Sequence, residues 1–312
     1  MHREEIDILR YALRRLLGAV PTLFLIITAA FFMMRIAPGG PFDQERTLEA
    51  TVLENLNRTF GLDKPLWQQY AMYLNNLLHG DMGPSFVFRD KRVHEILGEG
   101  LPVSMQLGFL ALLLALFIGV CMGTVAALRQ NSKADYFVVA LATFGITVPP
   151  FVVAPVLALV FAVFLGWLPA QGWGRADQMV LPVIALALPQ VAVIARLTRG
   201  AMIEALRSDH VRTAKAYGLP ASMVVIKHAL RAAVLPAISY LGPAAAALLT
   251  GSIVVEQVFN LPGIGRYFVQ GALNRDYTMV MGTVVIVAVF VILFNLMVDL
   301  LFAVFDPRVR YD

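Results

Sequence analysis

The sequence predicts an all-α integral membrane protein with six transmembrane helices. Its 312 residues are 59% apolar and only 15% charged, with a mean hydropathy of +0.72, far from the average of soluble domains. The apolar residues gather in continuous runs of about the 20 residues that a helix needs to cross a bilayer, without the strand-like alternation of a barrel. The predicted spans are residues 16–34, 107–128, 136–165, 179–195, 232–255 and 281–305.

The first run is expected to remain in the protein as a span. It is longer than the apolar core of a signal peptide, which has about 7–15 residues, and no small-x-small cleavage site follows. The sequence Arg-Ile-Ala-Pro-Gly-Gly at 35–40 favours a helix exit instead.

The segment 35–100 is too polar for the bilayer and long enough for a small structure of its own. Pro65 suits the first turn of a helix, and the apolar residues after it recur at helical spacing. We therefore expect one or two amphipathic helices over the outer surface. The residues of that pattern are Leu66, Tyr70, Tyr73, Leu74 and Leu77.

The second span carries a row of small residues four positions apart. Such a row lines one face of a helix and lets a neighbouring backbone approach closely. It predicts a helix-packing face, within the subunit or against a partner. The row is Ala111, Ala115, Gly119, Gly123 and Ala127.

The third span is too long for a straight crossing, and it contains Pro149, Pro150 and Pro155. Prolines inside a helix remove backbone hydrogen bonds, so a kink or a broken helix is expected. The break would either line a transport pathway or belong to a bent packing helix.

The positions of Lys and Arg predict the orientation. With the N-terminus inside, 15 of the 25 basic residues fall in inner segments and only Arg175, Arg266 and Arg275 in short outer loops. The other seven basic residues lie in the segment 35–100. A segment of this length is translocated across the membrane with little regard to its charge. Both termini are therefore expected in the cytoplasm, and the net charge of +4 needs no nucleic acid.

Several kinds of chemistry have no support in the sequence. Gly never precedes Lys, so the chain has no phosphate-binding P-loop. The clearest ionisable candidates for ion coupling, Glu256 and Asp299, lie near span ends. The lone Cys121 excludes an intramolecular disulfide, and the five histidines lack metal-ligand spacing. We expect no catalytic residue, no metal and no cofactor in this chain.

A polar island of about 36 residues, 196–231, separates two strongly apolar runs. Residues 204–219 predict a short helix that Gly218 closes in the left-handed C′ position. Pro220 then prevents a simple continuation, and a second helix, 223–230, leads back to the membrane. We call this helix–turn–helix unit, residues 204–230, the elbow.

The elbow resembles the EAA loop of binding-protein-dependent ABC importer permeases, which has E-A-A, three residues, G, nine residues and then I-x-L-P. Arg212, Thr213 and Ala214 occupy the first three places, and Gly218 matches the glycine. His228, Leu230 and Arg231 stand where the family has Ile, Leu and Pro, so the entry into the next helix departs from the pattern. The resemblance implies that the elbow couples to an ATPase. The implied coupling residues are Glu204, Ser208, Asp209, Arg212, Thr213, Ala214, Gly218 and Leu219.

Six motifs in order make the chain similar to the peptide and nickel branch of these permeases. They are Ile-Ala-Pro-Gly at 36–39, Gly-Asp-Met-Gly-Pro-Ser at 80–85, Arg-Gly-Ala-Met at 199–202, Leu-Pro-Gly-Ile-Gly at 261–265, Asn-Arg-Asp-Tyr at 274–277 and Asp-Pro-Arg at 306–308. Within that branch, residues 38–46 look like the oligopeptide permease B subunit rather than a dipeptide or nickel one.

Two of these motifs also have a purely structural interpretation. Pro262 and Gly263 suit a type II turn, with the glycine at positive φ. Arg275, Asp276 and Tyr277 suit a surface hydrogen-bond cluster. Residues that bind substrate are not identified from the sequence.

The resemblance implies a type I ABC importer permease fold and a place in the bacterial inner membrane. Its implied partners are a second homologous permease subunit of the C type, two ABC ATPases that bind ATP and Mg, an extracytoplasmic peptide-binding protein, the peptide and membrane lipid. Dipeptides, nickel chelates or other peptide-like cargo remain alternatives, and an ATP-independent channel or ion-coupled carrier is a remote one.

The chain divides accordingly into three parts. Residues 1–34 form the cytoplasmic N-terminus and first span, 35–100 the extracytoplasmic segment, and 101–312 the permease core that contains the coupling loop at 196–231.

Overall fold

The computed structural model describes residues 2–36, 50–88 and 91–305. Within these ranges the chain is helical, and its one β-bridge joins Pro84 to Arg92. The helices are α1 (His2–Ile36), α2 (Ala50–Thr59), α3 (Leu66–Leu78), α4 (Val93–Leu128), α5 (Lys133–Thr147), α6 (Pro150–Leu157), the π-helix η1 (Ala158–Phe164), α7 (Ala176–Arg207), α8 (Asp209–Ala216), α9 (Ala221–Met223), the π-helix η2 (Val224–Ala229), α10 (Leu230–Ala233), α11 (Leu235–Ser239), α12 (Leu241–Val258), α13 (Ile264–Leu273) and α14 (Tyr277–Phe305).

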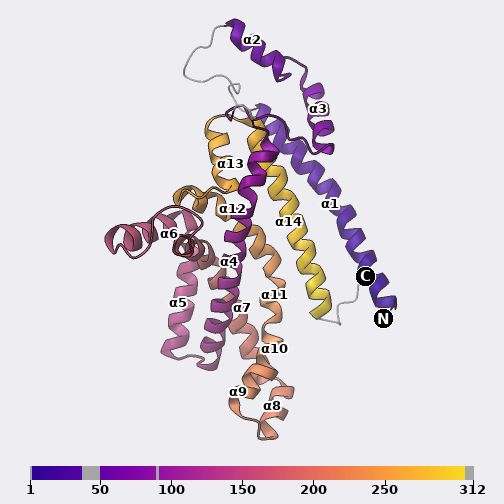
Figure 1. The fold of residues 1–312 in the computed structure, drawn as a ribbon. Helices are drawn as coiled ribbons and strands as arrows, with labels where there is room; N and C mark the ends of the chain where they lie inside the picture. The colour runs from indigo at the N-terminus through magenta and orange to yellow at the C-terminus, as the bar shows by residue number, and fades with distance from the viewer. Residues whose placement is uncertain (1, 37–49, 89–90, 306–312) are drawn as a thin grey trace.

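The long helices run along one axis, with α2 and α3 beyond one end and α8 and α9 beyond the other (Figure 1). Within the described residues, six helical stretches are long and apolar enough to cross a membrane, and a bent pair, α5 with α6–η1, counts as a seventh if it forms one span. The predicted all-α membrane fold with six candidate spans is confirmed. They are Arg15–Ile36, Val93–Leu128, Ala176–Arg207, Ala221–Ser239, Leu241–Val258 and Tyr277–Val298.

Two predicted spans differ in detail from the helices. The run 136–165 is not one straight helix, because α5 and the α6–η1 helix meet at a bend of 104°. Pro149 caps α6 and Pro150 begins it, so the backbone before them leaves the helical region. Figure 1 shows α6 leaving the bundle sideways. The expected break is therefore a sharp corner.

The predicted span 232–255 is interrupted as well. The chain rises from α9 to α12 with breaks at Val234 and Tyr240. Pro236 and Pro243 follow these breaks by two and three residues, and each removes one backbone donor from the helical ladder. The apolar stretch is long enough to qualify as two successive candidate spans, Ala221–Ser239 and Leu241–Val258.

The core forms where α4, α7, α6 and α12 meet. Leu107, Leu181, Leu186, Ile194 and Leu248 are almost fully buried there. The helix α7 contacts α4 along much of its length and also contacts α5, α6 and α12. It is the most buried of the candidate spans, and its continuation leads directly into the elbow.

The helices α1 and α14 pack on each other at the side of this core. Two helices form in the segment 35–100, and Pro65 is the N-cap residue of the second, α3. Tyr70 on α3 contacts Thr28 of α1 through a 2.5 Å hydrogen bond and Phe31 through its ring. The face of α3 that carries Tyr70 thus covers the end of α1.

Candidate functional site

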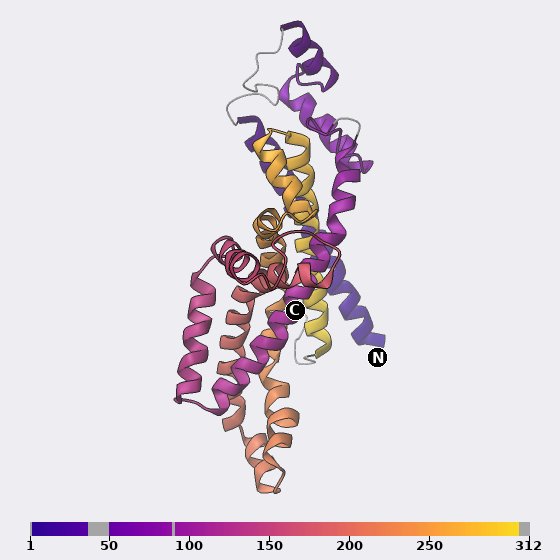
Figure 2. The ribbon, with the colours of Figure 1, turned by 60° about the vertical axis from the view of Figure 1, so that its left-hand side comes forward.

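The elbow begins without a loop, because α7 runs to Arg207 and α8 starts at Asp209. Ser208 is the only residue between them, and its hydroxyl donates to the Ala205 carbonyl at 2.5 Å. The elbow projects from the end of the molecule opposite α2 and α3 in both views (Figures 1 and 2). In the chain, a single residue therefore separates α8 from the central helix.

The elbow has a small hydrophobic core of its own. Val211 and Ala214 of α8 are buried against Met202 and Ala205 of α7. The returning chain closes the cluster with Val224, Ala229 and Ala233. Of the eight implied coupling residues, Ala214 is buried and Leu219 half-buried against this core.

The end of α8 is closed by a complete backbone cap. Gly218 has φ +74°, in the left-handed region. Its N–H donates to the Lys215 carbonyl at 3.0 Å, and the Leu219 N–H donates to the Ala214 carbonyl at 3.4 Å. This pair of bonds is the Schellman motif, which satisfies the last carbonyls of a helix and fixes the direction of the outgoing chain.

The remaining implied coupling residues are exposed, except for the half-buried Ser208. Arg212 and Asp209 are strongly exposed and pair at 3.3 Å, while the Thr213 hydroxyl bonds to the Asp209 carbonyl at 2.9 Å. Glu204 is exposed on α7, and Tyr217 is 82% exposed beside the cap. The surface offered to a partner is thus a short capped helix with polar side chains and one exposed aromatic ring.

The second helix of the elbow differs from the predicted range 223–230. It starts at Ala221, directly after the N-cap Pro220, and Val224–Ala229 is a π-helix. A π-helix bonds each residue to the fifth one along rather than the fourth, which widens the turn. The chain therefore returns to the membrane through a widened helical turn.

A buried ion pair at the base of the elbow was not predicted. Asp135 of α5 is 2% exposed and accepts two hydrogen bonds from the Arg199 guanidinium of α7, at 2.5 and 2.8 Å. The Asn131 N–H donates to the same carboxylate at 2.8 Å. This bidentate pair fixes α5 to α7 about one and a half turns before the elbow. The position of Arg199 beside an apolar run was the one sequence signal for such a pair. It could not identify the partner, which lies 64 positions away.

The small-residue row of α4 lies against α7. Ala111, Ala115, Gly119, Gly123 and Ala127 are all buried. A Cβ at Gly123 would lie 2.5 Å from the Ala195 carbonyl oxygen, and one at Gly119 would lie 2.7 Å from Ile194. The single exposed Cys121 faces away from this contact. Backbone contact between α4 and α7 thus continues from the core to the level of Arg199.

The turn predicted at Pro262 and Gly263 is wrong. Gly263 has φ −96° and caps α13, and the positive φ belongs to Asn260. A side chain on Gly263 would collide with the carboxylate of Glu256, which is fully buried and accepts from the Gly265 N–H at 2.7 Å. The glycines therefore let the start of α13 fold around Glu256, which stabilises the positive end of the helix.

The surface cluster predicted at 275–277 is also wrong, because Asp276 is fully buried. Its carboxylate accepts from the Ser85 hydroxyl and from the backbone N–H groups of Phe86 and Met279. It therefore caps the start of α14 and fixes the loop after α3 to that helix. Two motifs almost 200 positions apart meet at this aspartate.

Some predicted features lie outside the described residues. The motifs at 38–46 and 306–308 fall there, as do residues 37–39 of the motif at 36–39 and the side chain of Asp299.

Two family profiles match nearly all of the sequence. The profile of the binding-protein-dependent transport system inner membrane component matches residues 119–311, and the profile of its N-terminal part matches residues 8–108. The chain belongs to this family. It is thus a multi-pass protein of the inner membrane, and the predicted family with its type I ABC importer permease fold is confirmed.

Named relatives cover almost the whole chain. The oligopeptide transport system permease protein OppB of Haemophilus influenzae and that of Escherichia coli K12 are each 50% identical over 305 residues, which is 97% of this chain and 100% of theirs. The dipeptide transport system permease protein DppB of Bacillus subtilis is 42% identical over 96% of this chain and 98% of its own. A solved amino acid ABC transporter is 20% identical, with a TM-score of 0.48 over 69% of this chain and 94% of that one.

Proposed function

We propose that this chain is one of two pore-forming permease subunits of an ATP-driven oligopeptide importer. The elbow is its coupling site for an ATPase. The second permease, two ATPases with ATP and Mg, and an extracytoplasmic peptide-binding protein complete the complex. The observation that carries the proposal is the elbow itself, a capped helix with its own core, joined to the central helix α7 by one residue.

A rigid elbow suits the transmission of force. When ATP draws the two ATPases together, a helix seated on one of them moves with it. Because Val211 and Ala214 are packed on Met202 and Ala205, α8 moves α7 rather than bending away from it. The ion pair between Asp135 and Arg199 then carries the motion to α5. Coupling requires that nucleotide binding favours one pore state over the other, since a ligand shifts an equilibrium only by its differential affinity.

Oligopeptides are the proposed cargo because the OppB relatives are 50% identical and the DppB relative 42%. The experiment is uptake of labelled tripeptides, dipeptides and nickel chelates by proteoliposomes that hold the complete complex, with and without ATP. We expect ATP-dependent uptake of tripeptides. Uptake of nickel chelate or dipeptide alone would assign the complex to another branch, and uptake without ATP would contradict the mechanism.

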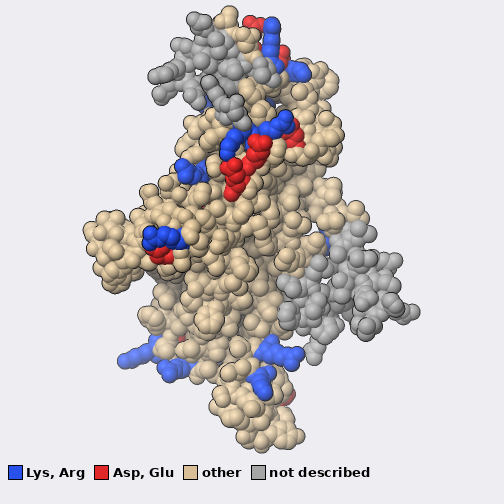
Figure 3. Space-filling model, in the orientation of Figure 1, with Lys and Arg blue, Asp and Glu red and all other residues tan. Residues whose placement is uncertain are grey.

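The proposed orientation places the elbow and both termini in the cytoplasm. Lys and Arg gather around the elbow end of the molecule, while both signs of charge are mixed at the other end (Figure 3). This distribution agrees with the positive-inside rule. Single cysteines in a Cys121→Ala background test it with an impermeant reagent. Labelling from outside at a Ser208→Cys position, or from inside at a Trp67→Cys position, would reverse the orientation.

A further inference from the structure

A pocket of about 270 Å³ lies between the end of α1, helix α3 and the start of α14, at the opposite end from the elbow. Its walls combine aromatic rings with polar groups. The rings belong to Phe31, Phe60, Phe86 and Tyr277. Neither the coupling site nor the α4–α7 contact includes these residues.

Two cations that line the pocket have no acidic partner among the described residues. Arg35 of α1 is half-buried, with its guanidinium 5.3 Å from the Phe31 ring centre and 5.4 Å from that of Tyr277. Among the described residues it has no ion pair. Among the described residues, the Lys64 ammonium has one hydrogen-bond partner, the Met72 sulfur at 3.4 Å.

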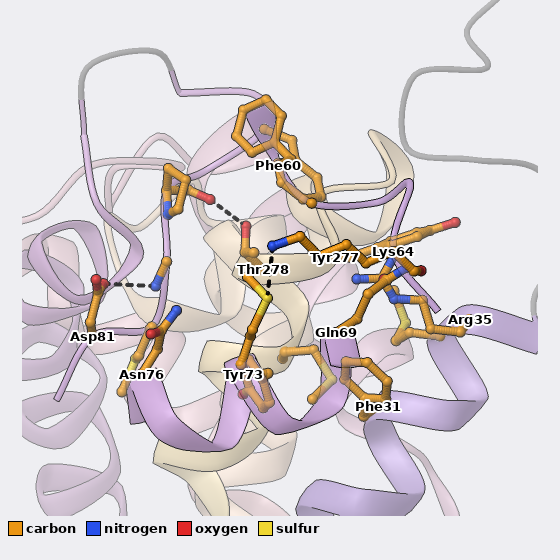
Figure 4. A pocket seen from close by; sticks show the side chains of 18 of the residues that line it. Phe31, Arg35, Phe60, Lys64, Gln69, Tyr73, Asn76, Asp81, Tyr277 and Thr278 are labelled. Atoms are coloured by element: carbon orange, nitrogen blue, oxygen red, sulfur yellow. Dashed lines mark hydrogen bonds between the residues drawn. The ribbon is translucent and has the colours of Figure 1, made fainter. Parts of the chain in front are cut away.

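The other charges of the pocket are already paired. Asp81, the one acidic residue that lines it, binds Arg92 at 2.7 Å and the Gly83 N–H at 2.9 Å. It lies across the pocket from Arg35 (Figure 4). Arg58 pairs with Glu54 at 2.7 Å. Among the described residues, Arg35 and Lys64 are therefore the two cations of the pocket without an acidic partner.

Two residues that line the pocket each carry a buried side-chain oxygen with no hydrogen-bond partner among the described residues. The two atoms are the Tyr73 hydroxyl oxygen and the Gln69 side-chain oxygen, which stand four residues apart on one face of α3. Burial raises the pKa of Tyr73 to about 12, so the hydroxyl keeps its proton. Leaving a buried polar atom unpaired is unfavourable, which favours a ligand that pairs with both.

We propose that this pocket binds the carboxyl-terminal end of a peptide. Arg35, Lys64 and the Tyr73 hydroxyl receive the carboxylate, the Gln69 oxygen accepts the N–H of the last peptide bond, and the aromatic rings enclose the last side chain. The inference deepens the proposed function, on which it rests, by assigning one end of the cargo to this chain.

The size and chemistry of the pocket favour a peptide end over the alternatives. Pockets that enclose whole small ligands start at about 300 Å³, so this one holds only the end of an oligopeptide. The end of a peptide has a carboxylate, which accepts hydrogen bonds, next to an N–H, which donates one. The pocket offers both the matching donors and a matching acceptor, the Gln69 oxygen. A phospholipid phosphate would use the cations but would leave the Gln69 oxygen unpaired.

The test is binding of a fluorescent Ala-Phe-Ala tripeptide and its carboxyl-terminal amide to the complete permease–ATPase complex in phosphatidylcholine nanodiscs. We expect the acid to bind about tenfold more tightly than the amide, since hydrogen bonds to charged groups are the strong ones. Lys64→Met should remove most of that difference by weakening only the acid. Lys91→Met is the matched control, because Lys91 pairs with Glu99 at 3.0 Å outside the pocket.

Tyr73→Phe separates a binding role from a structural one. Removing an unpaired buried hydroxyl should leave the melting temperature of the complex unchanged or higher, while the acid binds about threefold more weakly. Tyr70 lies on the same helix as Tyr73, and its hydroxyl bonds to Thr28 of α1. Tyr70→Phe should therefore leave binding unchanged.

Three results would overturn the inference. They are equal affinities for acid and amide in the unmodified complex, unchanged acid binding in Lys64→Met and Tyr73→Phe, and complete displacement of the acid by phosphatidylglycerol, which would assign the pocket to a lipid phosphate. ATP-dependent uptake is measured in parallel on the same preparation. Its absence alone would contradict the proposed function and leave the binding result standing.

Discussion

The contact between α4 and α7 and the turn at the end of α8 both depend on glycine, for opposite reasons. At Gly123 the backbone is ordinary helix, but a Cβ would lie 2.5 Å from the Ala195 carbonyl oxygen and 2.7 Å from the Thr198 Cβ. At Gly218 no atom lies within 4 Å of an added Cβ, but φ is +74°. The first glycine provides space for a neighbouring backbone. The second provides a backbone conformation that L-residues avoid.

The two regions therefore tolerate different changes. The α4–α7 contact should respond to the volume of a new side chain, because interhelical contact in a membrane depends on close packing. The α8 turn should be sensitive to a β-branched residue at Gly218 but little affected by the volume of the new side chain. A rigid contact beside a conformationally defined turn gives the coupling site a fixed support and a fixed direction.

The largest expected effect is at the α4–α7 contact. Gly123→Leu adds four side-chain carbons at a position where even a Cβ atom would collide with the backbone of α7. The helix α7 must therefore move away from α4. We expect little or no assembled complex, measured as the yield of copurified subunits. Gly119→Leu should behave alike, since a Cβ there lies 2.7 Å from Ile194.

Gly98→Leu is the matched control for this prediction. Gly98 lies on the same helix, is exposed and has no atom within 4 Å of an added Cβ. A normal yield for Gly98→Leu and a low one for Gly123→Leu would assign the loss to the contact. A normal yield for Gly123→Leu would mean that α4 and α7 separate at no cost.

The next effect is expected at the ion pair that joins α5 to α7. Arg199→Ala leaves the Asp135 carboxylate buried with only the Asn131 N–H, and removing one partner of a buried pair costs about 3–5 kcal/mol. The melting temperature of the purified complex should fall clearly. The double variant Arg199→Leu with Asp135→Leu should recover much of the loss. An unchanged melting temperature in Arg199→Ala would show that the pair contributes nothing.

The sequence predicted those features that depend on near neighbours. The row at Gly119 and Gly123 is visible as a spacing of four, and the cap at Gly218 follows from Gly before Leu and Pro. Prolines likewise indicated the break near residue 149, although not its angle of 104°.

Features that depend on distant neighbours could not be predicted. Asp135 meets Arg199 across 64 positions and Ser85 meets Asp276 across 191, and no local pattern specifies such partners. The same reason explains the error at Gly263. The Pro-Gly pair is typical of a type II turn, but the buried Glu256 carboxylate imposes a different requirement on that glycine.

A smaller effect is expected at the α8 turn. Gly218→Val forces a β-branched residue to φ +74°, with a strain of about 1 kcal/mol or more. The complex should assemble, but the elbow should point differently and less peptide should be imported per ATP hydrolysed. Gly218→Asn is the matched control, because Asn adopts the left-handed conformation readily. Equal coupling ratios for the Val variant and the unmodified complex would show that the cap does not direct α8.

The smallest effect is expected at Arg212, on the exposed face of α8. Its side chain is 75% exposed and its ion pair with Asp209, 96% exposed, spans 3.3 Å. Exposed pairs contribute about 0–1 kcal/mol, so Arg212→Ala removes a charge without altering the turn. The peptide imported per ATP should change less than in Gly218→Val, measured in the same proteoliposomes. If Arg212→Ala abolished uptake while Gly218→Val imported at the normal ratio, a specific charge contact would carry the coupling. The shape of the elbow would then serve only to present that charge.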